Sequence, residues 1–564
     1  MLSAHPRQAC TIIILVLQVF LASCTPPLAG PIGESGGHEP TRGGTLELAL
    51  LGDVRTLDPA QITSGVEGSI AANLYAGLVD VTPEGAVVPV LADRVDVVET
   101  PPAVRVTLRP GLRFHDGAEV DAASVVRSFE RLVARGAPSV QATFLDVVRG
   151  VDAFRSGAAT AIDGLVVEGP RTLRIDLRHF DAAFLPSLTL IAARPVCPSA
   201  APSGSPSFVA CGAGPFRLPA GGFVRGESVA VERFDGWFRP DLPRLERVRW
   251  RLQASPREQD ILFSRGRLHV ARDLPSHVLA RYLDDPRWAN LHEREAATTF
   301  WGEALNTERF PFDNVEVRRA VASAIDRNHI VAIDPLRIRV GTGPLPPGAA
   351  GFDPSLRCQK FDRAAALEHM RRAGFPYDPA TRQGGVEAPI SYLATARTFA
   401  ERGAQVLQAQ LAAIGLRLAP RLVSYPAYIA TTRRRGAVPM ASTGWTQDFP
   451  DPSNFFDALY TKASISTDDS TNTSAYSNDA LEALLASAHR EFRPTERTAI
   501  FARASRLICD EAPIAFTHVP EAVVLRQGFV RELVLHPVWL YALERTWLSH
   551  VPVLPTSHPV EGVR

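Results

Sequence analysis

Lysine is almost missing from this chain of 564 residues: Lys360 and Lys462 are the only two, and every other basic residue is arginine. The 60 basic residues are balanced by 60 acidic residues, so the formal net charge is zero. The arginines are spread along the chain, and their largest run, at 433–435, is short. A neutral chain without a basic cluster gives no electrostatic reason to expect a nucleic-acid partner.

Long apolar runs are missing beyond the N-terminus, where no stretch approaches the roughly 18 apolar residues of a membrane span. The N-terminal run at 11–23, TIIILVLQVFLAS, has the length of a signal-peptide core and follows a positive charge at Arg7. It ends in Leu-Ala-Ser-Cys24, which resembles the bacterial lipobox. We therefore expect a lipoprotein signal peptide at 1–23 and lipidation of Cys24. The alternative is an ordinary signal peptide with an incidental cysteine.

The segment that follows, at 24–42, is rich in Pro and Gly and has almost no large apolar side chain. This composition is typical of a flexible tether. The sequence thus predicts a folded body held by a lipid anchor at the periplasmic or extracellular face of the cytoplasmic membrane.

Motifs of common catalytic sites are also missing. The chain has no G-x-S-x-G elbow, H-E-x-x-H pair, phosphate-binding P-loop or G-x-G-x-x-G turn after a strand. It has no C-x-x-C pair, which argues against a zinc site or thiol redox chemistry. His115 has no second histidine at ligand spacing, so no metal is predicted there. We expect no catalytic residues and no cofactor, and an enzyme with an unrecognised constellation is the distant alternative.

Four cysteines lie beyond the N-terminal segment: Cys197, Cys211, Cys358 and Cys509. An exported protein meets oxidising conditions, so these thiols can pair. Cys197 and Cys211 enclose a loop-like stretch, PSAAPSGSPSFVA, and we favour a disulfide between them. The sequence does not determine the connectivity, and four inert buried thiols are the alternative.

The periodicity of apolar residues predicts strands mixed with helices. Strand-like alternation occurs at 45–52, 104–108 and 172–177. Helical periodicity occurs at 121–136, 314–330, 363–373, 398–414, 479–492 and 496–511, with Asp121 and Asn314 as candidate N-caps. The mixture indicates an α/β or α+β body, and the length exceeds what one hydrophobic core organises.

One segment, at 108–132, carries a distinctive succession of turns. It reads LRPGLRFHDGAEVDAASVVRSFERL and resembles the signature of the bacterial extracellular solute-binding proteins of the peptide and nickel class, family 5. Other motifs similar to that family follow in its order: GGTL at 43–46, LDP at 57–59, LYAGL at 74–78, GAGPF at 212–216, PFDNVEVRRAVASAIDR at 311–327, GW at 444–445 with DFPDPSNFF at 448–456, and DEAP at 510–513. The resemblance covers about 43–545. Ala76 and Ala213 depart from the family pattern, which usually has an acidic residue and a Thr there.

The resemblance implies an α/β, two-lobe periplasmic-binding-protein fold (class II, Venus-flytrap) with an extra subdomain in lobe I. Lobe I would take 43–300 and a return segment at 520–560, and lobe II would take 301–519. The first crossing between lobes is expected near 299–306. Such lobes close on a ligand that contacts both, which shifts the population toward the closed state.

The resemblance also implies ligand-binding residues. In the peptide-binding branch an aspartate of the G-W-x-x-D stretch pairs with the peptide's amino group, and the matching residue here is Asp448. Trp445 would form an apolar wall of the cleft, with core packing as an equal alternative. A carboxylate-binding arginine is expected near 392–402, where Arg397 and Arg402 are the candidates. A turn in a Pro-rich loop is the alternative for Asp448, and surface exposure for the arginines.

The expected partners follow from this resemblance: a small peptide or similar solute, the permease subunits of an ABC transporter, and the membrane surface through the lipid anchor. The family is usually monomeric, so a monomer is expected. A nickel chelate, an oligosaccharide or an opine-like compound is the alternative ligand. A receptor lobe used for signalling is the alternative role, which the sequence does not separate from import.

Overall fold

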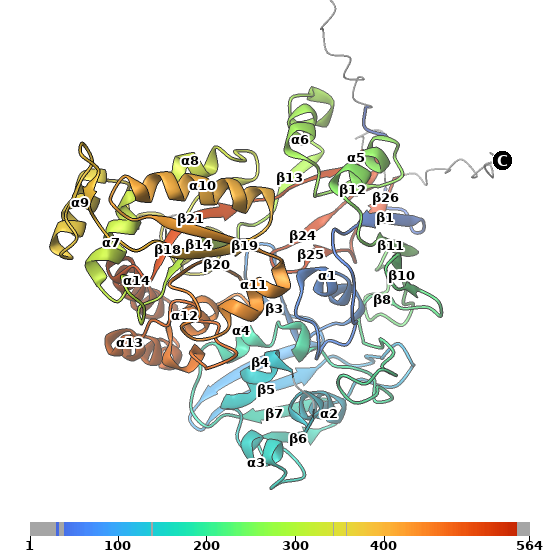
Figure 1. Cartoon of the computed structure of the whole chain (residues 1–564). Helices are drawn as coiled ribbons and strands as arrows, with labels where there is room; N and C mark the ends of the chain where they lie inside the picture. Colours follow the sequence, from blue (N-terminus) through green and yellow to red (C-terminus); the bar gives the residue numbers. More distant parts are fainter. Residues whose placement is uncertain (1–29, 33–38, 137–138, 342, 357, 550–564) are drawn as a thin grey trace, which may run out of the picture.

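Several separate sheets and several hydrophobic clusters organise the chain in the computed structural model (Figure 1). The structure describes residues 30–32, 39–136, 139–341, 343–356 and 358–549. The predicted signal peptide, Cys24 and most of the tether lie outside the described residues. In the described part, no helix combines the length and the apolar character that crossing a membrane requires.

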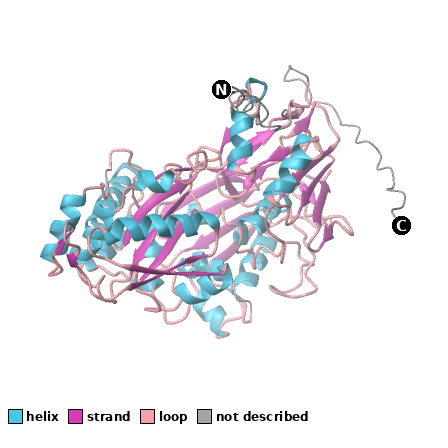
Figure 2. Cartoon of the chain, turned by 45° about the horizontal axis from the view of Figure 1, so that its top comes forward, coloured by secondary structure: helices cyan, strands magenta, loops and turns pink. Residues whose placement is uncertain are grey.

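A six-stranded mixed sheet, in the order β15-β21-β14-β20-β18-β19, forms the centre of lobe II. Its strands are β14 (Thr299–Leu305), β15 (Ile338–Val340), β18 (Ile390–Thr395), β19 (Leu418–Val423), β20 (Met440–Thr446) and β21 (Ile514–Pro520). Separate apolar clusters cover its two faces, one holding Leu305 and Tyr392 and the other holding Phe300 and Phe516. Helices lie on both faces (Figure 2).

The helices of lobe II lie where the periodicity predicted them, except for those at 425–432 and 453–460, which were not predicted. They are α7 (Val315–Ala324), α8 (Arg327–Val331), α9 (Arg363–Arg372), α10 (Thr398–Ala412), α11 (Tyr425–Thr432), α12 (Ser453–Tyr460), α13 (Asp479–Arg490) and α14 (Pro494–Glu511). The helix expected at 314–330 is in fact two helices, because Ile325 has extended backbone and the side chain of Asp326 caps a new helix by accepting from the Asn328 N–H.

Lobe I includes a five-stranded sheet and a three-stranded sheet. The five-stranded sheet pairs β1 (Thr45–Ala49), β11 (Arg247–Arg251), β10 (Ser228–Arg233) and β8 (Phe216–Arg217) in that order, with β9 (Phe223–Val224) also on β10. The three-stranded sheet contains β12 (Val270–Ala271), β22 (Val523–Arg526) and β13 (His292–Arg294). Lobe I also has the two-stranded pairs β2 (Val79–Val81) with β3 (Val87–Pro89), β23 (Val530–Arg531) with β26 (Trp547–Leu548), and β24 (Val534–His536) with β25 (Leu540–Ala542). In lobe II, β16 (Tyr377–Asp378) pairs with β17 (Gln383–Gly384).

A four-stranded antiparallel sheet forms a subdomain of lobe I with its own core. Its strands are β4 (Ala92–Glu99), β5 (Pro102–Leu108), β7 (Thr172–Asp176) and β6 (Leu165–Gly169), in that order. The helices of lobe I are α1 (Gly65–Leu74), α2 (Ala122–Val133), α3 (Val151–Ser156), α4 (Phe184–Ser187), α5 (Pro256–Ser264) and α6 (Ser276–Leu283). The apolar face of α2, with Val125, Phe129 and Leu132, is fully buried in this core.

Asp121 closes the N-terminus of α2 with a capping box. Its carboxylate accepts from the Ser124 N–H at 2.7 Å, and the Ser124 hydroxyl accepts from the Asp121 N–H at 3.1 Å. We expect Asp121→Ala to lower the free energy of unfolding by about 1 kcal/mol, because a helix N–H loses its acceptor. Asp121→Asn should lose much less, since its amide oxygen still accepts. Equal losses in both variants by denaturant unfolding would contradict the capping role.

The chain crosses between the lobes twice, and the two crossings lie side by side. It leaves the three-stranded sheet at Arg294 and enters the six-stranded sheet at Thr299, then returns between Pro520 and Val523. The Glu295 N–H donates to the Ala522 carbonyl at 3.0 Å, so one crossing is hydrogen-bonded to the other. Paired short crossings of this kind favour a hinge over free tumbling of the lobes.

Candidate functional site

The candidate ligand residues lie in loops at one edge of the six-stranded sheet. β18 is parallel to both β19 and β20, so the loops that follow these three strands emerge at the same edge. Arg397 follows β18 and Tyr425 follows β19. Trp445 lies near the end of β20, and Asp448 follows that strand. Ligands of sheets with parallel strands usually bind beyond the carboxyl ends of those strands. The topology therefore brings the predicted site residues to an edge suited to binding.

Asn454, in the first turn of α12, holds Trp445 and Asp448 in place. Its amide oxygen accepts from the Trp445 indole N–H at 3.1 Å and from the Asp448 backbone N–H at 2.9 Å. Its amide nitrogen donates to the Asp448 carboxylate at 3.3 Å. Asn454 itself is only 7% exposed, so these three bonds are made in a protected setting. The indole and the carboxylate are thus fixed relative to each other before any ligand arrives.

The loop itself is anchored by a buried ion pair. Asp451 is 3% exposed and its carboxylate is bonded to Arg497 of α14, at 2.8 Å from Nη2 to Oδ1. The same carboxylate accepts from the Ser453 N–H at 2.9 Å and so starts α12. Asp451 is therefore a structural residue, and Asp448 is the carboxylate of this loop that remains for a ligand.

Among the described residues, Asp448 has no cationic partner. It forms no ion pair with any residue that the structure describes, and its carboxylate is held only by the Asn454 amide. Burial raises the pKa of Asp448 to about 6, an effect that the Asn454 hydrogen bond opposes. A partly buried carboxylate without a positive partner favours the approach of a cationic group, such as an ammonium.

The Asp448 loop reaches the other lobe. Phe449, the next residue, packs against the apolar core of the lobe I subdomain. The Gln447 N–H donates to the Thr298 carbonyl in the first crossing at 3.0 Å, and the Thr298 hydroxyl donates to the Pro537 carbonyl of the return segment at 3.0 Å. The loop thus touches lobe I, lobe II and the hinge, so a movement between the lobes changes its surroundings.

The two candidate arginines are exposed. Arg397 is the residue before α10, and its guanidinium lies over the Tyr425 ring, 5.8 Å from the ring centroid. Arg402 lies one turn into α10 and is exposed as well. No described hydrogen bond or ion pair joins either arginine to Asp448. Tyr425 is 54% exposed, so Arg397 and Tyr425 form an accessible pair at the same sheet edge.

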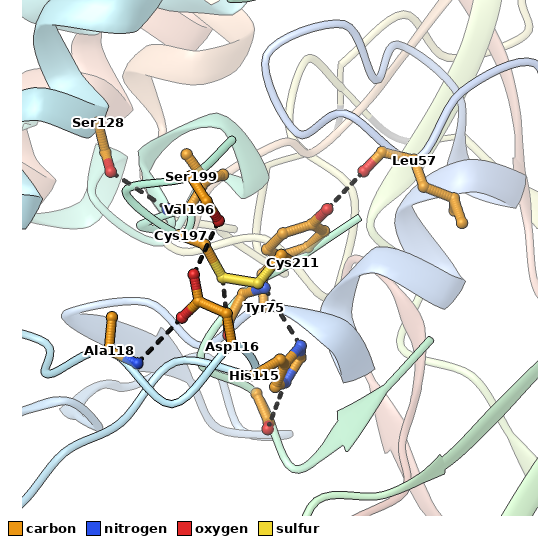
Figure 3. Close-up of a disulfide and its surroundings, with 12 residues drawn as sticks. Leu57, Tyr75, His115, Asp116, Ala118, Ser128, Val196, Cys197, Ser199 and Cys211 are labelled. Atoms are coloured by element: carbon orange, nitrogen blue, oxygen red, sulfur yellow. Dashed lines mark hydrogen bonds between the residues drawn. A yellow bond between two sulfur atoms is a disulfide. The ribbon is translucent and has the colours of Figure 1, made fainter. Parts of the chain in front are cut away.

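Figure 3 shows that three of the family-like motifs meet around a disulfide in lobe I. Cys197 and Cys211 are bonded, with Cα atoms 5.5 Å apart; this is the pair that the sequence favoured. His115 of the FHDG turn accepts from the Gly212 N–H at Nδ1 (3.2 Å) and contacts the Gly214 carbonyl through Nε2 (3.1 Å). Burial lowers the pKa of His115 to about 4, so the ring is neutral and Nε2 carries the proton.

Close packing explains the glycines of the GAGPF motif. A Cβ on Gly212 would lie 2.3 Å from the Tyr75 ring, and a Cβ on Gly214 would lie 2.5 Å from the Leu74 carbonyl carbon. The Tyr75 hydroxyl in turn donates to the Leu57 carbonyl at 2.8 Å. These motifs therefore specify the fold of lobe I and leave the choice of ligand to other residues.

Metal ligation has little support among the described residues. The cluster of potential ligands there contains Asp116, Cys197 and Cys211, and both sulfurs are already in the disulfide. A cavity of about 480 Å³ opens elsewhere on lobe I, and neither Trp445 nor Asp448 lines it. One of its lining residues, Asp58, is bound by both terminal nitrogens of Arg131, at 2.9 and 2.7 Å. Neither feature replaces the Asp448 loop as the candidate site.

Sequence reasoning missed two features of lobe II. Asn454 lies inside the quoted motif DPSNFF, yet only the folded helix shows that its side chain turns back to Trp445 and Asp448. A second disulfide joins Cys358 to Cys509 across 151 residues. No spacing rule pairs cysteines so far apart, and only their common place beside the α14 core reveals the bond.

Comparison with known proteins assigns the family. Residues 86–467 match the model for bacterial extracellular solute-binding proteins, family 5, middle part. The glutathione-binding protein GsiB of Escherichia coli K12 is 25% identical over 474 residues, which cover 83% of this chain and 87% of that protein.

Two solved structures share the fold. The periplasmic binding protein DppA of Helicobacter pylori, in complex with the peptide STSA, superposes with a TM-score of 0.74 at 22% identity, covering 90% of this chain and 99% of that one. Clavulanic acid biosynthesis oligopeptide binding protein 2 superposes with a TM-score of 0.80 at 20% identity, covering 93% and 100%. The two-lobe α/β fold expected from the sequence is thereby confirmed, and because the family model matches more than half of the chain, this protein belongs to the bacterial extracellular solute-binding proteins of family 5.

Proposed function

We propose that this chain is the extracytoplasmic substrate-binding lipoprotein of an ABC transporter, and that it captures a small peptide by closing its two lobes and delivers it to the permease. The observation that carries the peptide proposal is the Asp448 carboxylate, which is partly buried between the lobes and lacks a cationic partner among the described residues. An N-terminal ammonium would supply the missing charge, and such a charge-assisted bond is about twice as strong as a neutral one.

The neighbouring residues suit the rest of a peptide. Trp445 offers an indole face whose orientation Asn454 fixes, and aromatic faces pack well against side chains and backbone amides. Arg397 is the proposed partner for a peptide carboxylate, because it is exposed at the same sheet edge and forms no ion pair with a described residue. The relatives support this ligand class: GsiB is a glutathione-binding protein, and the DppA structure contains a peptide.

Native mass spectrometry of freshly purified protein tests the proposal directly. We expect a retained mass that dissociates on unfolding and that fragments as a short peptide. A retained nickel chelate, oligosaccharide or opine-like compound would replace the peptide and keep the transport role. A ligand returned chemically altered after incubation would instead point to an enzyme and overturn the proposal.

Membrane anchoring is a separate part of the proposal and rests on Cys24. We expect the mature protein to begin at Cys24 and to carry acyl chains there, since the preceding residues resemble a lipobox. Mass spectrometry of the N-terminal peptide from the membrane fraction checks this, with Cys24→Ser as the variant that should be released from the membrane. An unmodified Cys24 in a membrane-bound protein would contradict it.

Peptide affinity should depend on pH through Asp448. Burial raises the pKa of Asp448 to about 6 in the free protein, and an ammonium binds only the ionised carboxylate. Affinity should therefore be highest near pH 7 and fall by up to about tenfold for each pH unit below 6, with a second fall above about pH 8, where the peptide ammonium loses its proton. Calorimetric titration between pH 4.5 and 8 measures this, with Asp448→Asn as the control that should lose the fall below pH 6.

A further inference from the structure

A histidine lies between two carboxylates that belong to different lobes. His489, at the end of α13 in lobe II, contacts Asp181 of lobe I through Nδ1 at 2.8 Å and Asp457 of α12 in lobe II through Nε2 at 2.9 Å. The His489 side chain is 24% exposed and that of Asp181 is 17% exposed, so the bridge across the interface is largely protected from solvent.

Two further contacts surround this bridge. The Ala182 N–H of lobe I donates to the His489 carbonyl at 2.8 Å. Phe180 of lobe I meets Phe492 of lobe II edge to face, with ring centroids 6.4 Å apart. In Figure 1 the segment before α4 approaches α12 and α13 at the same place. The lobes therefore meet here through an ionic, a backbone and an aromatic contact within a few residues.

The charges around His489 favour its protonated form. Burial lowers the pKa of His489, but the hydrogen bonds and charges of Asp181 and Asp457 outweigh that and raise it to about 10. For Asp181, burial raises the pKa, but the hydrogen bond and charge of His489 outweigh this effect and bring the pKa below its usual value. Burial raises the pKa of Asp457, an effect that His489 opposes.

Other charged groups complete the surroundings of this bridge. His179 lies near Asp181 and helps to keep that carboxylate ionised. The negative charge of Asp451 raises the pKa of Asp457, but Arg497 pairs with Asp451 and balances that charge. On α13 itself, Arg490 adjoins His489, and Glu491 beyond it pairs with Arg493. The facing carboxylates therefore dominate the charge balance at His489.

We propose that Asp181, His489 and Asp457 form a latch that holds the two lobes in the arrangement seen here. The latch crosses the interface at Asp181, so opening the lobes breaks the Asp181 bond while leaving the Asp457 bond within lobe II. An open lobe II would keep a histidine with one carboxylate, and an open lobe I would keep a solvated aspartate. The ion pair across the interface thus adds its free energy only to the closed arrangement.

The latch also shares a helix with the candidate ligand site. α12 carries Asn454, which positions Trp445 and Asp448, and Asp457 follows Asn454 by three residues, almost one helical turn. When the lobes close, the latch therefore connects this helix, whose first turn shapes the site, through His489 to Asp181 of lobe I. This inference rests on the two-lobe fold and not on the identity of the ligand, so it can be tested in ligand-free protein.

The pH dependence of the latch follows from the raised pKa of His489 in the closed arrangement. In the open arrangement His489 keeps the Asp457 carboxylate, which holds its pKa above the usual value of about 6.5, whereas in the closed arrangement Asp181 is added and the pKa is about 10. The contribution of His489 to closure is therefore complete below about pH 6.5 and declines, by up to about tenfold in the closed-to-open ratio per unit, as pH rises toward 10. Protonation of the carboxylates weakens the latch at the acid end, below about pH 4.

Small-angle X-ray scattering of purified protein, dialysed free of ligand, measures the opening. We expect His489→Gln and Asp181→Asn each to lower the closed-to-open ratio at pH 6.5 at least tenfold and to increase the radius of gyration. The double variant should lose little more than either single variant, because both remove the same bond. Raising the pH from 6.5 to 9.5 should open the wild type and leave His489→Gln unchanged.

His369→Gln is the matched control. His369 pairs with Glu316 at 2.7 Å, with similar exposure, but both residues belong to lobe II. This variant should keep the scattering and the pH response of the wild type. If His489→Gln gives the wild-type curve at every pH, or if His369→Gln opens the protein equally, the latch is wrong. Thermal unfolding identifies a variant that has lost its fold, and Asp181→Asn then tests the same bond from the other lobe.

Discussion

Replacing both Cys358 and Cys509 by alanine is expected to lower the stability of lobe II more than any other substitution proposed here. The disulfide closes a loop of 151 residues between the segment before α9 and the last helix of the lobe, α14. In the chain-entropy model, a cross-link over a loop of that length stabilises the native state by about 5 kcal/mol, because it restricts the unfolded chain. The expected result is a fall of about 10–20 °C in the unfolding temperature of lobe II.

The other disulfide provides the internal comparison. Cys197 and Cys211 are only 14 residues apart, so their bond should contribute about 3 kcal/mol by the same model, and in lobe I. Because two lobes can unfold in separate steps, differential scanning calorimetry with assignment of each transition is the appropriate measurement. A larger loss on removing the short-loop bond, or a loss confined to lobe I when the long-loop bond is removed, would contradict the prediction.

Local patterns predicted several of the longer helices, because such patterns depend on neighbouring residues. The expected helices at 363–373 and 398–414 match α9 and α10 to within two residues at each end. The N-cap expected at Asp121 is confirmed by its bond to Ser124, although α2 ends at Val133, three residues before the expected end at 136. The capping signal is chemical and local, whereas the helix end depends on what packs beyond it.

Contacts between distant residues escaped prediction for the same reason. His489 meets Asp181 across 308 positions, and neither residue carries a sequence signal that marks it as a bridge. The break between α7 and α8 was also missed, because the apolar face continues through Ile325 while the backbone does not. Periodicity reports which side chains face a core, but it does not report where the chain changes direction.

The candidate site was located by motif and explained by structure. The sequence placed Asp448 and Trp445 in one stretch through resemblance alone. The folded chain adds the physical reason: Asn454 fixes both groups, and the described residues provide no cation for the carboxylate. Arg397 lies at the same sheet edge, over the Tyr425 ring, and we propose it as the partner of a ligand carboxylate.

Asp448→Asn should abolish most of the peptide affinity. The substitution keeps the shape of the side chain but removes the negative charge that we propose pairs with the ligand's ammonium. Losing one partner of a desolvated charge pair costs at least about 2 kcal/mol, so affinity should fall by about thirtyfold or more. Isothermal titration with the peptide identified by mass spectrometry measures this at pH 7.5, where Asp448 is ionised in the wild type.

The same substitution should not weaken the fold, and that opposite effect separates a lost ligand contact from a damaged protein. The ionised carboxylate is disfavoured by burial in the free protein, as its raised pKa of about 6 shows, so a neutral amide should leave the unfolding temperature equal or higher. Asp468→Asn, which removes one charge from an exposed position of the same lobe, should change neither affinity nor stability. Unchanged peptide affinity in a folded Asp448→Asn protein would remove Asp448 from the site, because a carboxylate that contacts an ammonium cannot lose its charge without loss of binding.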